Sequence, residues 1–566
     1  MSRRLVLLPV LALTLTLLVQ PSQAHVPYAQ WTEHTFASGD GTVLHADVLR
    51  PFGAKGRTPV ILSVGPYFGH WYQDAAGSGI SNTDPLSLQG SHPSKRFEDF
   101  QFGAKVFERG YTFVMVHLRG SGESGGCLDL LGPGEAMDVK AAVEWAARQP
   151  WSTGKVGLYG KSYDAETGLV AAALRPKGLA AVVAQEAGAS GYDGVYANGV
   201  PDYVTRQYPN LQYGVRGEMH DETQGDLSEA SLAEDQRVYS HSADCQIGLA
   251  GWQLNDPSSA FWRDRDYLVR GKGSTVPTLL TVGFLDGQTK PSGRALEFWQ
   301  NLRGPKRLWV GPWRHYRGNE LDNGRLAMGR AGWFDEVMRW YDHFLKGAPV
   351  SDDPAVVLQS APSGTWTAER TWPPTTRPLS LPLAAGSYVD DGLNEGSAKA
   401  TEFGPGSLGY VNVGDTRIPG SRTGSGVWTQ GPVLASSINL AGKATLTLDL
   451  AVQVPDTNVA VDLYDVAPDH KAVLVSRQAS LVDTSGRLAL ELWAQDWVFA
   501  KGHRIGFAVS GSNNENWLHT PTGTTVTVRG GTLTLPVRVS PLGPRLAGNR
   551  SPYLETWLKE AVVAAP

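Results

Sequence analysis

Residues 155–174 read K-V-G-L-Y-G-K-S-Y-D-A-E-T-G-L-V-A-A-A-L, and this stretch decides the fold. A short β-prone run, 156–159, leads into Gly160, and a run of small residues that favours a helix begins directly after Ser162. A strand, a sharp turn and a helix with serine at the apex form a nucleophile elbow, which exposes the serine hydroxyl beside a helix N-terminus. The alternative is a serine that caps an ordinary helix after a parallel strand.

Buried strands and helices alternate on both sides of this turn. Continuous apolar runs are typical of strands that are covered on both faces, and apolar residues at helical spacing separate these runs. The pattern predicts an α/β fold of the α/β-hydrolase type, with a parallel sheet between two layers of helices. We predict strands at residues 42–49, 58–64, 110–118, 156–159, 179–185, 275–283 and 306–310, and helices at 134–149 and 333–345.

Changes in composition and in hydrophobic pattern along the sequence divide the chain into further parts. Residues 187–274 are polar, so we predict a helical cap inserted over the sheet edge; long irregular loops are the alternative. Short alternating strands after residue 373 predict an all-β sandwich of jelly-roll type. The predicted parts are a signal peptide (1–24), the hydrolase domain (25–186 and 275–350), the cap (187–274), a linker (351–372), the C-terminal β-sandwich (373–545) and a tail (546–566).

The N-terminus has the features of a secretory signal peptide. The positive residues M-S-R-R precede an apolar run over 5–18, and small residues stand at the cleavage positions before His25. The run is too short for a membrane anchor, and no later stretch is apolar enough to span a bilayer. We therefore expect a secreted, extracellular product that has no membrane association after cleavage.

Composition narrows the set of partners. The chain has 566 residues and a net charge of −5 without a basic tract, which argues against a nucleic-acid partner. No histidines, cysteines and carboxylates have the spacing of metal ligands, so we expect no metal and no organic cofactor. The two cysteines, Cys127 and Cys245, form a disulfide if the protein is exported, or else remain as buried thiols. The sequence leaves the oligomeric state open.

A glycine-rich loop upstream of Ser162 matches the letters of two known motifs. Residues 122–126 match G-x-S-x-G around Ser124, and residues 120–125 match the dinucleotide pattern G-x-G-x-x-G. Both motifs require a helix to begin at once, but C-L-D-L-L-G-P-G intervenes here. We therefore assign neither a nucleophile nor a nucleotide site to this loop.

The nucleophile needs a base and an acid that follow later strands of the sheet. In α/β-hydrolases the chain order is serine, then acid, then histidine, each in a loop after a strand. Asp286 follows the predicted strand 275–283, and His315 follows the strand 306–310. The carboxyl ends of parallel strands share one edge of the sheet, so we predict Ser162, Asp286 and His315 as the catalytic triad.

The motifs together resemble the cocaine esterase / X-Pro dipeptidyl-peptidase family of serine hydrolases. The resemblance rests on G-K-S-Y at 160–163, G-x-x-D-G at 283–287, G-P-W-x-H at 311–315, W-Y-D-H-F-L-K-G at 340–347 and G-H-R-I at 502–505. It implies a hydrolase domain, a helical cap and a C-terminal jelly roll that meet at the active site. It also implies that the Tyr67 hydroxyl, in V-G-P-Y, and the backbone N–H of Tyr163 form the oxyanion hole.

Three positions depart from the family pattern. Asp164 stands where an apolar residue is common, Ala165 where glycine is usual, and His117 where aspartate is frequent. The sequence offers no physical account of His117. Asp164 could cap the helix, bind a substrate amine, or have no effect.

The resemblance and the predicted triad indicate a hydrolase that works through an acyl-enzyme on a peptide or small ester. The first expectation is an Xaa-Pro dipeptidyl-peptidase; an esterase or amidase, and a non-catalytic binding protein, are the alternatives. A dipeptidyl-peptidase requires an acidic group to hold the free α-amine of the substrate. The candidates in the sequence are Asp164, Asp193, Asp202, Glu218 and Asp221.

Overall fold

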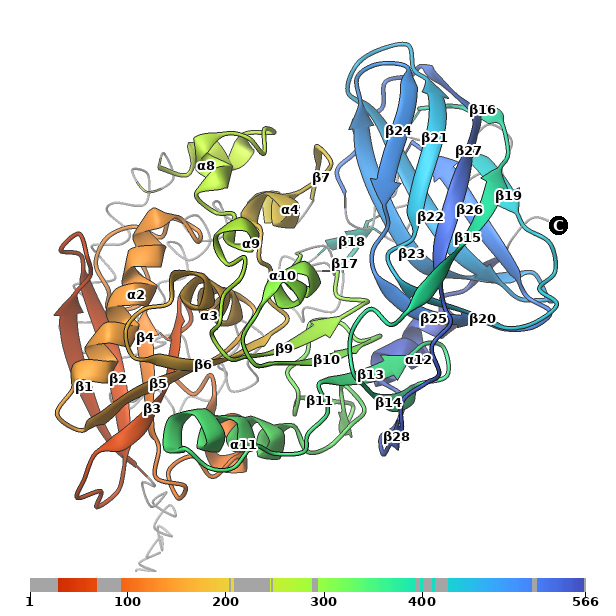
Figure 1. The fold of residues 1–566 in the computed structure, drawn as a ribbon. Helices are drawn as coiled ribbons and strands as arrows, with labels where there is room; N and C mark the ends of the chain where they lie inside the picture. The colour runs from red at the N-terminus through yellow and green to blue at the C-terminus, as the bar shows by residue number, and fades with distance from the viewer. Residues whose placement is uncertain are drawn as a thin grey trace, which may run out of the picture.

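The structure is a computed structural model. The chain forms an α/β part followed by a β-rich part, and the two parts lie side by side (Figure 1). The predicted signal peptide lies outside the described residues. The structure describes residues 29–68, 93–202, 205–207, 245, 248–287, 294–391, 398–400, 410–412, 426–511 and 517–563.

A large mixed sheet forms the centre of the α/β part. Among the described residues it has eleven strands in the order β1-β2-β4-β3-β5-β6-β9-β10-β13-β14-β28, and the run from β4 to β13 is parallel. The strands are β1 (Ala29–Ala37), β2 (Val43–Pro51), β3 (Thr58–Gly65), β4 (Thr112–His117), β5 (Ser152–Lys161), β6 (Leu179–Gln185), β9 (Thr278–Gly283), β10 (Lys306–Gly311), β13 (Val356–Ser360), β14 (Thr365–Glu369) and β28 (Arg545–Leu546).

Helices cover both faces of this sheet, as the apolar runs predict. Alternate residues of a strand point to opposite faces, so Val60 and Leu62 join one hydrophobic core while Ile61 joins the other. The first core includes α2, α3 and α10, and the second includes α1 and α11. Figure 1 shows α2, α3 and α10 on one side of the sheet and α11 on the other. These helices are α1 (Glu98–Gly103), α2 (Pro133–Arg148), α3 (Tyr163–Leu174), α10 (Ala295–Asn301) and α11 (Trp333–Lys346).

The predicted linker 351–372 is wrong, because it contains two strands of the large sheet. Val356 and Leu358 of β13 point into the first core, and Val357 points into the second. Strand 306–310 is therefore followed by three further strands of this sheet. The predicted tail contains β28 and helix α12 (Pro552–Lys559), whose Leu554 is buried in the core of the β-rich part.

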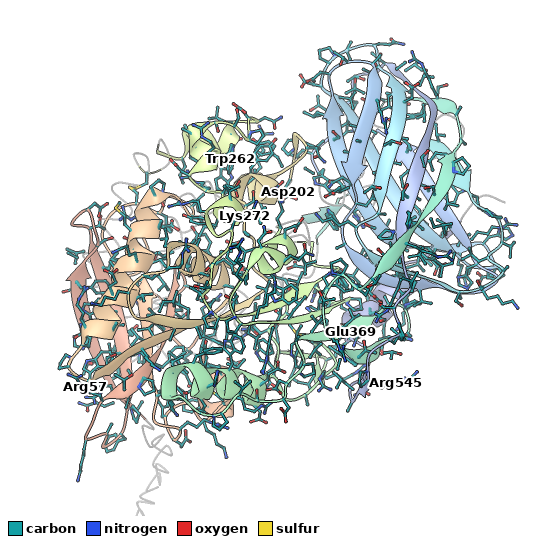
Figure 2. The ribbon with its side chains drawn as sticks, in the orientation of Figure 1. Arg57, Asp202, Trp262, Lys272, Glu369 and Arg545 are labelled. Carbon is teal, nitrogen blue, oxygen red and sulfur yellow. A yellow bond between two sulfur atoms is a disulfide. The ribbon has the colours of Figure 1, made fainter. Side chains whose placement is uncertain are left out.

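The segment between β6 and β9 is described only in part, so the helical cap stays a prediction. Trp252 and Trp262 of this segment are buried in the first core of the α/β part, and Figure 2 labels Trp262. Cys245 forms a disulfide with Cys127, with 5.4 Å between the Cα atoms, so the segment is tied to the loop before α2. Its described elements are α4 (Gly191–Val195), β7 (Tyr196–Ala197), β8 (Val200–Pro201), η1 (Thr205–Gln207), η3 (Ala250–Gln253), α8 (Ala260–Arg263) and α9 (Tyr267–Arg270).

The β-rich part consists mainly of two sheets that share one hydrophobic core. Strand β27 (Thr525–Arg538) is a single strand of 14 residues, and it belongs to only one of the two sheets. The all-β character is as predicted, and the jelly-roll connectivity stays a prediction. One sheet contains β15 (Thr376–Leu383), β16 (Gly386–Val389), β20 (Ile438–Gly442), β21 (Thr445–Ala451), β24 (Gly486–Glu491), β25 (Gln495–Phe499) and β27 (Thr525–Arg538); the other contains β19 (Val427–Gln430), β22 (Thr457–Val466), β23 (Lys471–Val482), β26 (Arg504–Ser510) and β29 (Val562–Val563).

Short ribbons complete the described secondary structure. They are β11 (Leu321–Asp322) with β12 (Arg325–Leu326), and β17 (Ala398–Ala400) with β18 (Tyr410–Asn412). Among the described residues, we find no helix with the length and apolar character needed to cross a membrane.

Polar contacts join the two parts, and one of them reaches the loop that carries Asp286. Glu369, labelled in Figure 2, accepts a hydrogen bond of 2.7 Å from Arg538 of β27. Gln495 of β25 donates to the carbonyl of Phe284 at 3.2 Å, and Phe284 lies in the loop that carries Asp286. The β-rich part therefore supports the acid loop directly.

Candidate active site

Ser162 occupies a strained turn between β5 and α3. Its φ and ψ are 64° and −129°, a region that residues with a side chain rarely occupy. A Cβ on Gly160 would lie 2.2 Å from the carbonyl oxygen of Asp164, so only glycine fits this close approach of strand and helix. The turn has the backbone of a nucleophile elbow rather than that of an ordinary helix cap, and Ser162 makes no capping hydrogen bond.

His315 and Asp286 meet at the same edge of the sheet. Asp286 follows β9 and His315 follows β10, and 2.8 Å separate the His315 Nδ1 and Asp286 Oδ2 atoms. Both side chains are largely buried. Because Asp286 holds Nδ1, the Nε2 atom of His315 is left to face a reacting group, which is the arrangement of a serine hydrolase base.

Glu186 is a buried carboxylate that connects the acid loop to the histidine loop. It accepts hydrogen bonds from the backbone N–H of Gly283 at 2.7 Å and from the indole N–H of Trp313 at 2.9 Å. Burial, followed by the charge of Asp286, raises the pKa of Glu186 to about 8. Glu186 thus holds the two loops at the spacing that lets Asp286 reach His315. No sequence motif pointed to this residue.

Ser162 and His315 line one cavity in the described part of the chain. The loop at Leu130 and Leu131 also lines this cavity, and both residues have positive φ angles. Arg265 donates to the carbonyl of Leu130 at 3.1 Å, and Tyr267 donates to that of Leu131 at 2.7 Å. The segment between β6 and β9 therefore shapes the cavity wall.

Tyr163 connects the elbow to this wall. Its hydroxyl donates to Glu135 at 2.7 Å and accepts a hydrogen bond from the backbone N–H of Leu131. Burial is the main reason that the pKa of Glu135 rises to about 8. Since Tyr163 is the first residue of α3, its backbone N–H has no acceptor within the helix. That N–H is therefore available as a donor beside Ser162, and its role in the oxyanion hole stays a prediction.

Tyr67, the second predicted oxyanion donor, packs on a buried ion pair. The Arg96 guanidinium carbon lies 3.9 Å from the centre of the Tyr67 ring, and Arg96 Nε lies 2.5 Å from Asp164 Oδ2. Burial raises the pKa of Asp164 to about 6, although Arg96 opposes the shift. Asp164 thus holds Arg96 under Tyr67. This contact accounts for an aspartate at a position that is commonly apolar.

Glu166 is the carboxylate that lines the cavity among the described residues. It lies one helical turn after Ser162, and its Oε1 accepts from the backbone N–H of Gly188 at 3.1 Å. Burial raises the pKa of Glu166 to about 7. Its side chain is part-exposed toward the cavity, so it can meet a cationic group of a ligand there. Glu166 belongs to no sequence motif, although its position four residues after the serine places it on the same face of the helix.

The predicted amine-binding residues lie elsewhere or are engaged. Asp164 pairs with Arg96, and Asp202 accepts two hydrogen bonds from Thr205. Asp193 pairs with Arg294 at 3.5 Å. Glu218 and Asp221 lie outside the described residues.

Burial and neighbouring charges shift the pKa of His315, the proposed base. Burial and then the positive charge of Lys161 lower the pKa of His315, while Asp286 raises it. Burial also lowers the pKa of Lys161 to about 8. A neutral His315 can accept a proton, so these effects favour the base form near neutral pH.

Two family models match this chain. A family model of X-Pro dipeptidyl-peptidases (S15 family) matches residues 40–317. A second model, of the C-terminal non-catalytic domain of X-Pro dipeptidyl-peptidases, matches residues 348–544. The chain belongs to the X-Pro dipeptidyl-peptidase family. This S15 family consists of serine hydrolases, and its two models together account for both the α/β part and the β-rich part.

Individual relatives extend this result. The "Putative Xaa-Pro dipeptidyl-peptidase" of Streptomyces avermitilis is 25% identical over 463 residues, which cover 76% of this chain but only 63% of that relative. The "Putative serine esterase Mb1866c" of Mycobacterium bovis is 25% identical over 599 aligned positions, covering 87% of this chain and 91% of the relative. A CocE/NonD family hydrolase from Staphylococcus aureus has the same fold, with a TM-score of 0.63, 18% identity and coverage of 89% of this chain and 93% of its own.

Proposed function

We propose that this S15-family chain hydrolyses acyl bonds through an acyl-enzyme on Ser162, and that it releases Xaa-Pro dipeptides from peptide N-termini. The observation that carries the proposal is that the loops carrying Ser162, Asp286 and His315 meet at one edge of the large sheet. Ser162 and His315 line the same cavity, and His315 Nδ1 lies 2.8 Å from Asp286.

In the proposed reaction His315 takes the proton of the Ser162 hydroxyl while the Ser162 oxygen attacks the substrate carbonyl. The Tyr67 hydroxyl and the Tyr163 N–H stabilise the oxyanion. His315 then gives the proton to the leaving amine, and the peptide bond breaks. Water attacks the acyl-enzyme with His315 again as base, which releases the acid and restores Ser162.

Glu166 is our candidate for the group that binds the α-amine of the substrate. It faces the cavity one turn from the nucleophile, whereas Asp164, Asp193 and Asp202 make other contacts. An ammonium ion beside a buried carboxylate stabilises the ionised carboxylate, which offsets the rise in the pKa of Glu166. Described residues of the segment between β6 and β9, including Trp252 and Arg265, line this cavity, so we also infer that this segment serves as a cap over the site.

An esterase that acts on small acyl or amino-acid esters is the second candidate. The similarity to the Mycobacterium bovis serine esterase, which is 25% identical to this chain and covered over 91% of its length, supports it. The triad and oxyanion donors would act in the same way on an ester.

The test compares Ala-Pro p-nitroanilide, its N-acetylated form and p-nitrophenyl butyrate as substrates, with the variants Glu166→Gln and Ser162→Ala. We expect cleavage of the free-amine anilide only, lost in Ser162→Ala. In Glu166→Gln, which retains an acceptor for Gly188, KM for this substrate should rise at least about tenfold, the effect of one lost charged contact of roughly 1.4 kcal/mol. Ester turnover without anilide turnover would instead identify an esterase, and an unchanged KM would exclude Glu166.

We further propose that the protein is exported after removal of residues 1–24. The support is the positive, apolar and small-residue pattern of the first 24 residues. N-terminal sequencing of protein from culture medium should begin at His25; retention in the cell pellet with the leader intact would contradict export.

A further inference from the structure

A second cluster of titratable side chains lies at the edge of the large sheet, on strands β1, β2 and β4. His45 and Asp47 are two residues apart on β2, so their side chains share one face. β2 pairs with β4 through Ala46 and Val116, which places His45 beside His117. Glu33 of β1 pairs directly with Asp47. None of these residues lines the cavity that holds Ser162.

The two imidazoles converge on one carboxylate from the glycine-rich loop. Glu123 Oε2 lies 2.7 Å from His117 Nδ1 and 3.9 Å from His45 Nδ1. Potential ligand atoms of these three residues all lie within 4.8 Å of one another. His117 is fully buried, and the side chains of His45 and Glu123 are less than 10% exposed.

The opposite nitrogen of each imidazole contacts a further carboxylate. His45 Nε2 lies 3.3 Å from Glu33, and His117 Nε2 lies 3.3 Å from Asp47. Trp31 donates its indole N–H to Asp47 at 2.8 Å. Metal-bound histidines typically donate the other ring N–H to a carboxylate, which fixes the tautomer and leaves the facing nitrogen as a ligand. Each of the two histidines therefore has a carboxylate at Nε2 and directs its Nδ1 toward Glu123.

We propose that His45, His117 and Glu123 bind one zinc ion. Two imidazole nitrogens and one carboxylate oxygen form a common ligand set for zinc, with the fourth position available to water. Nitrogen ligands disfavour calcium and magnesium, which prefer oxygen. Metal–ligand bonds of about 2.0–2.1 Å place tetrahedral ligands roughly 3.3 Å apart, so each imidazole needs to shift only about 0.6 Å relative to Glu123.

A proton could replace the metal, and the cluster would then be an ion pair of one imidazolium with Glu123 and Asp47. Three carboxylates surround the two rings, however, and a single proton would leave the cluster with two net negative charges. A divalent cation balances more of this charge, most of which is buried, and contacts both rings at once. The proposal also gives a physical reason for His117 at a position where the family often has aspartate.

The proposed ion would join the glycine-rich loop to the sheet. Ser124 lies next to Glu123, and its hydroxyl already bonds the backbone of both His45 and His117. The ring of Phe68 lies 6.1 Å from that of His117, and Phe68 follows Tyr67. We therefore infer a structural site that supports the loops beside the active site, independent of the reaction proposed above.

The experiment measures zinc uptake by the full mature chain after removal of metals with EDTA. Competition with a chromophoric chelator gives stoichiometry and affinity for wild type, His45→Gln, His117→Gln and His34→Gln. Glutamine places its amide near the former Nε2, so each variant retains the carboxylate contact and loses the Nδ1 ligand. His34 is on β1 beside Glu33 but outside the cluster, so His34→Gln is the matched control.

We expect one zinc ion per chain in wild type and His34→Gln, with affinity at least about tenfold weaker in the other two variants. Zinc should raise the Tm of wild type, because a ligand that binds only the folded state stabilises it. X-ray absorption should show imidazole ligands around the metal. Equal uptake by all four proteins would mean adventitious surface binding and would overturn the proposal. If the cluster variants do not fold, wild type decides alone: a Tm that neither EDTA nor zinc changes would overturn it.

Discussion

Two loops of this chain carry a serine after parallel strands of the same sheet, β4 and β5, and the two serines differ in backbone conformation, burial and surroundings. Ser162 has a strained backbone, begins a helix at once and borders a cavity. Ser124 is fully buried, and its hydroxyl donates to the carbonyl of His117 at 2.7 Å and accepts from the backbone N–H of His45 at 2.8 Å. Ser124 matches the literal G-x-S-x-G pattern, whereas Ser162 does not.

The comparison shows that the hydrogen-bond partners of a serine, rather than its flanking glycines, decide its chemistry. A hydroxyl with backbone partners on both sides is a structural crosslink, because attack on a substrate would leave buried groups unpaired. A hydroxyl raised on a strained turn retains reactivity, and the rest of the fold stabilises the strain. The predictions that follow test this division of roles.

Replacing the nucleophile gives the largest expected effect. Ser162→Ala should lower kcat by about 10⁴-fold or more, since the oxyanion hole and binding alone supply only a small part of the rate. The free energy of unfolding should stay the same or increase as the strained turn relaxes. Steady-state assays and thermal unfolding of the same preparation check both. More than a few per cent of wild-type turnover would rule out Ser162 as the nucleophile.

Changing Asp164→Asn tests whether the elbow also positions an oxyanion donor. The asparagine lacks the charge that holds Arg96 beneath Tyr67, so we expect kcat to fall by about ten- to a hundredfold, less than the loss of a whole oxyanion donor. KM should change little, because the substrate does not contact Asp164 in the proposed reaction. A variant in which KM changes and kcat does not would show that Asp164 acts on binding instead.

The matched change in the other loop should affect stability and leave catalysis intact. Ser124→Ala removes two buried hydrogen bonds, which should lower the free energy of unfolding by about 1–3 kcal/mol. The kcat of the folded protein should stay within about twofold of wild type. Denaturant unfolding and active-site titration separate the two quantities. A large fall in kcat per titrated site would mean that the two loops are coupled.

The sequence predicted the parts of the site that follow from strand order. Ser162, Asp286 and His315 could be identified because each follows a strongly apolar strand, and parallel strands bring their carboxyl ends to one edge. Arg96 and Glu186 could not, because each acts through contacts with loops that are remote in the chain. Their identities depend on packing, which no local pattern records.

The fold shows the same limit. Strands of the parallel centre were recognisable as continuous apolar runs, but β13 and β14 follow a polar stretch and resemble a linker. The cluster around His117 was equally hidden. Its ligands come from two strands and a turn, so no short spacing of metal ligands exists, and only the register of β2 against β4 brings the histidines together.

The smallest predicted effect concerns Lys161, the residue directly before the proposed nucleophile. Lys161 precedes Ser162, and its charge is one reason, after burial, that the pKa of His315 is lowered. His315 must be neutral to accept the serine proton, so activity falls as pH drops through its pKa. In Lys161→Met that pKa should rise, and the acid limb of kcat/KM should move to higher pH by less than about one unit. Lys155→Met, on the same strand but exposed, should leave the limb in place; equal shifts in both variants would show that Lys161 does not tune the base.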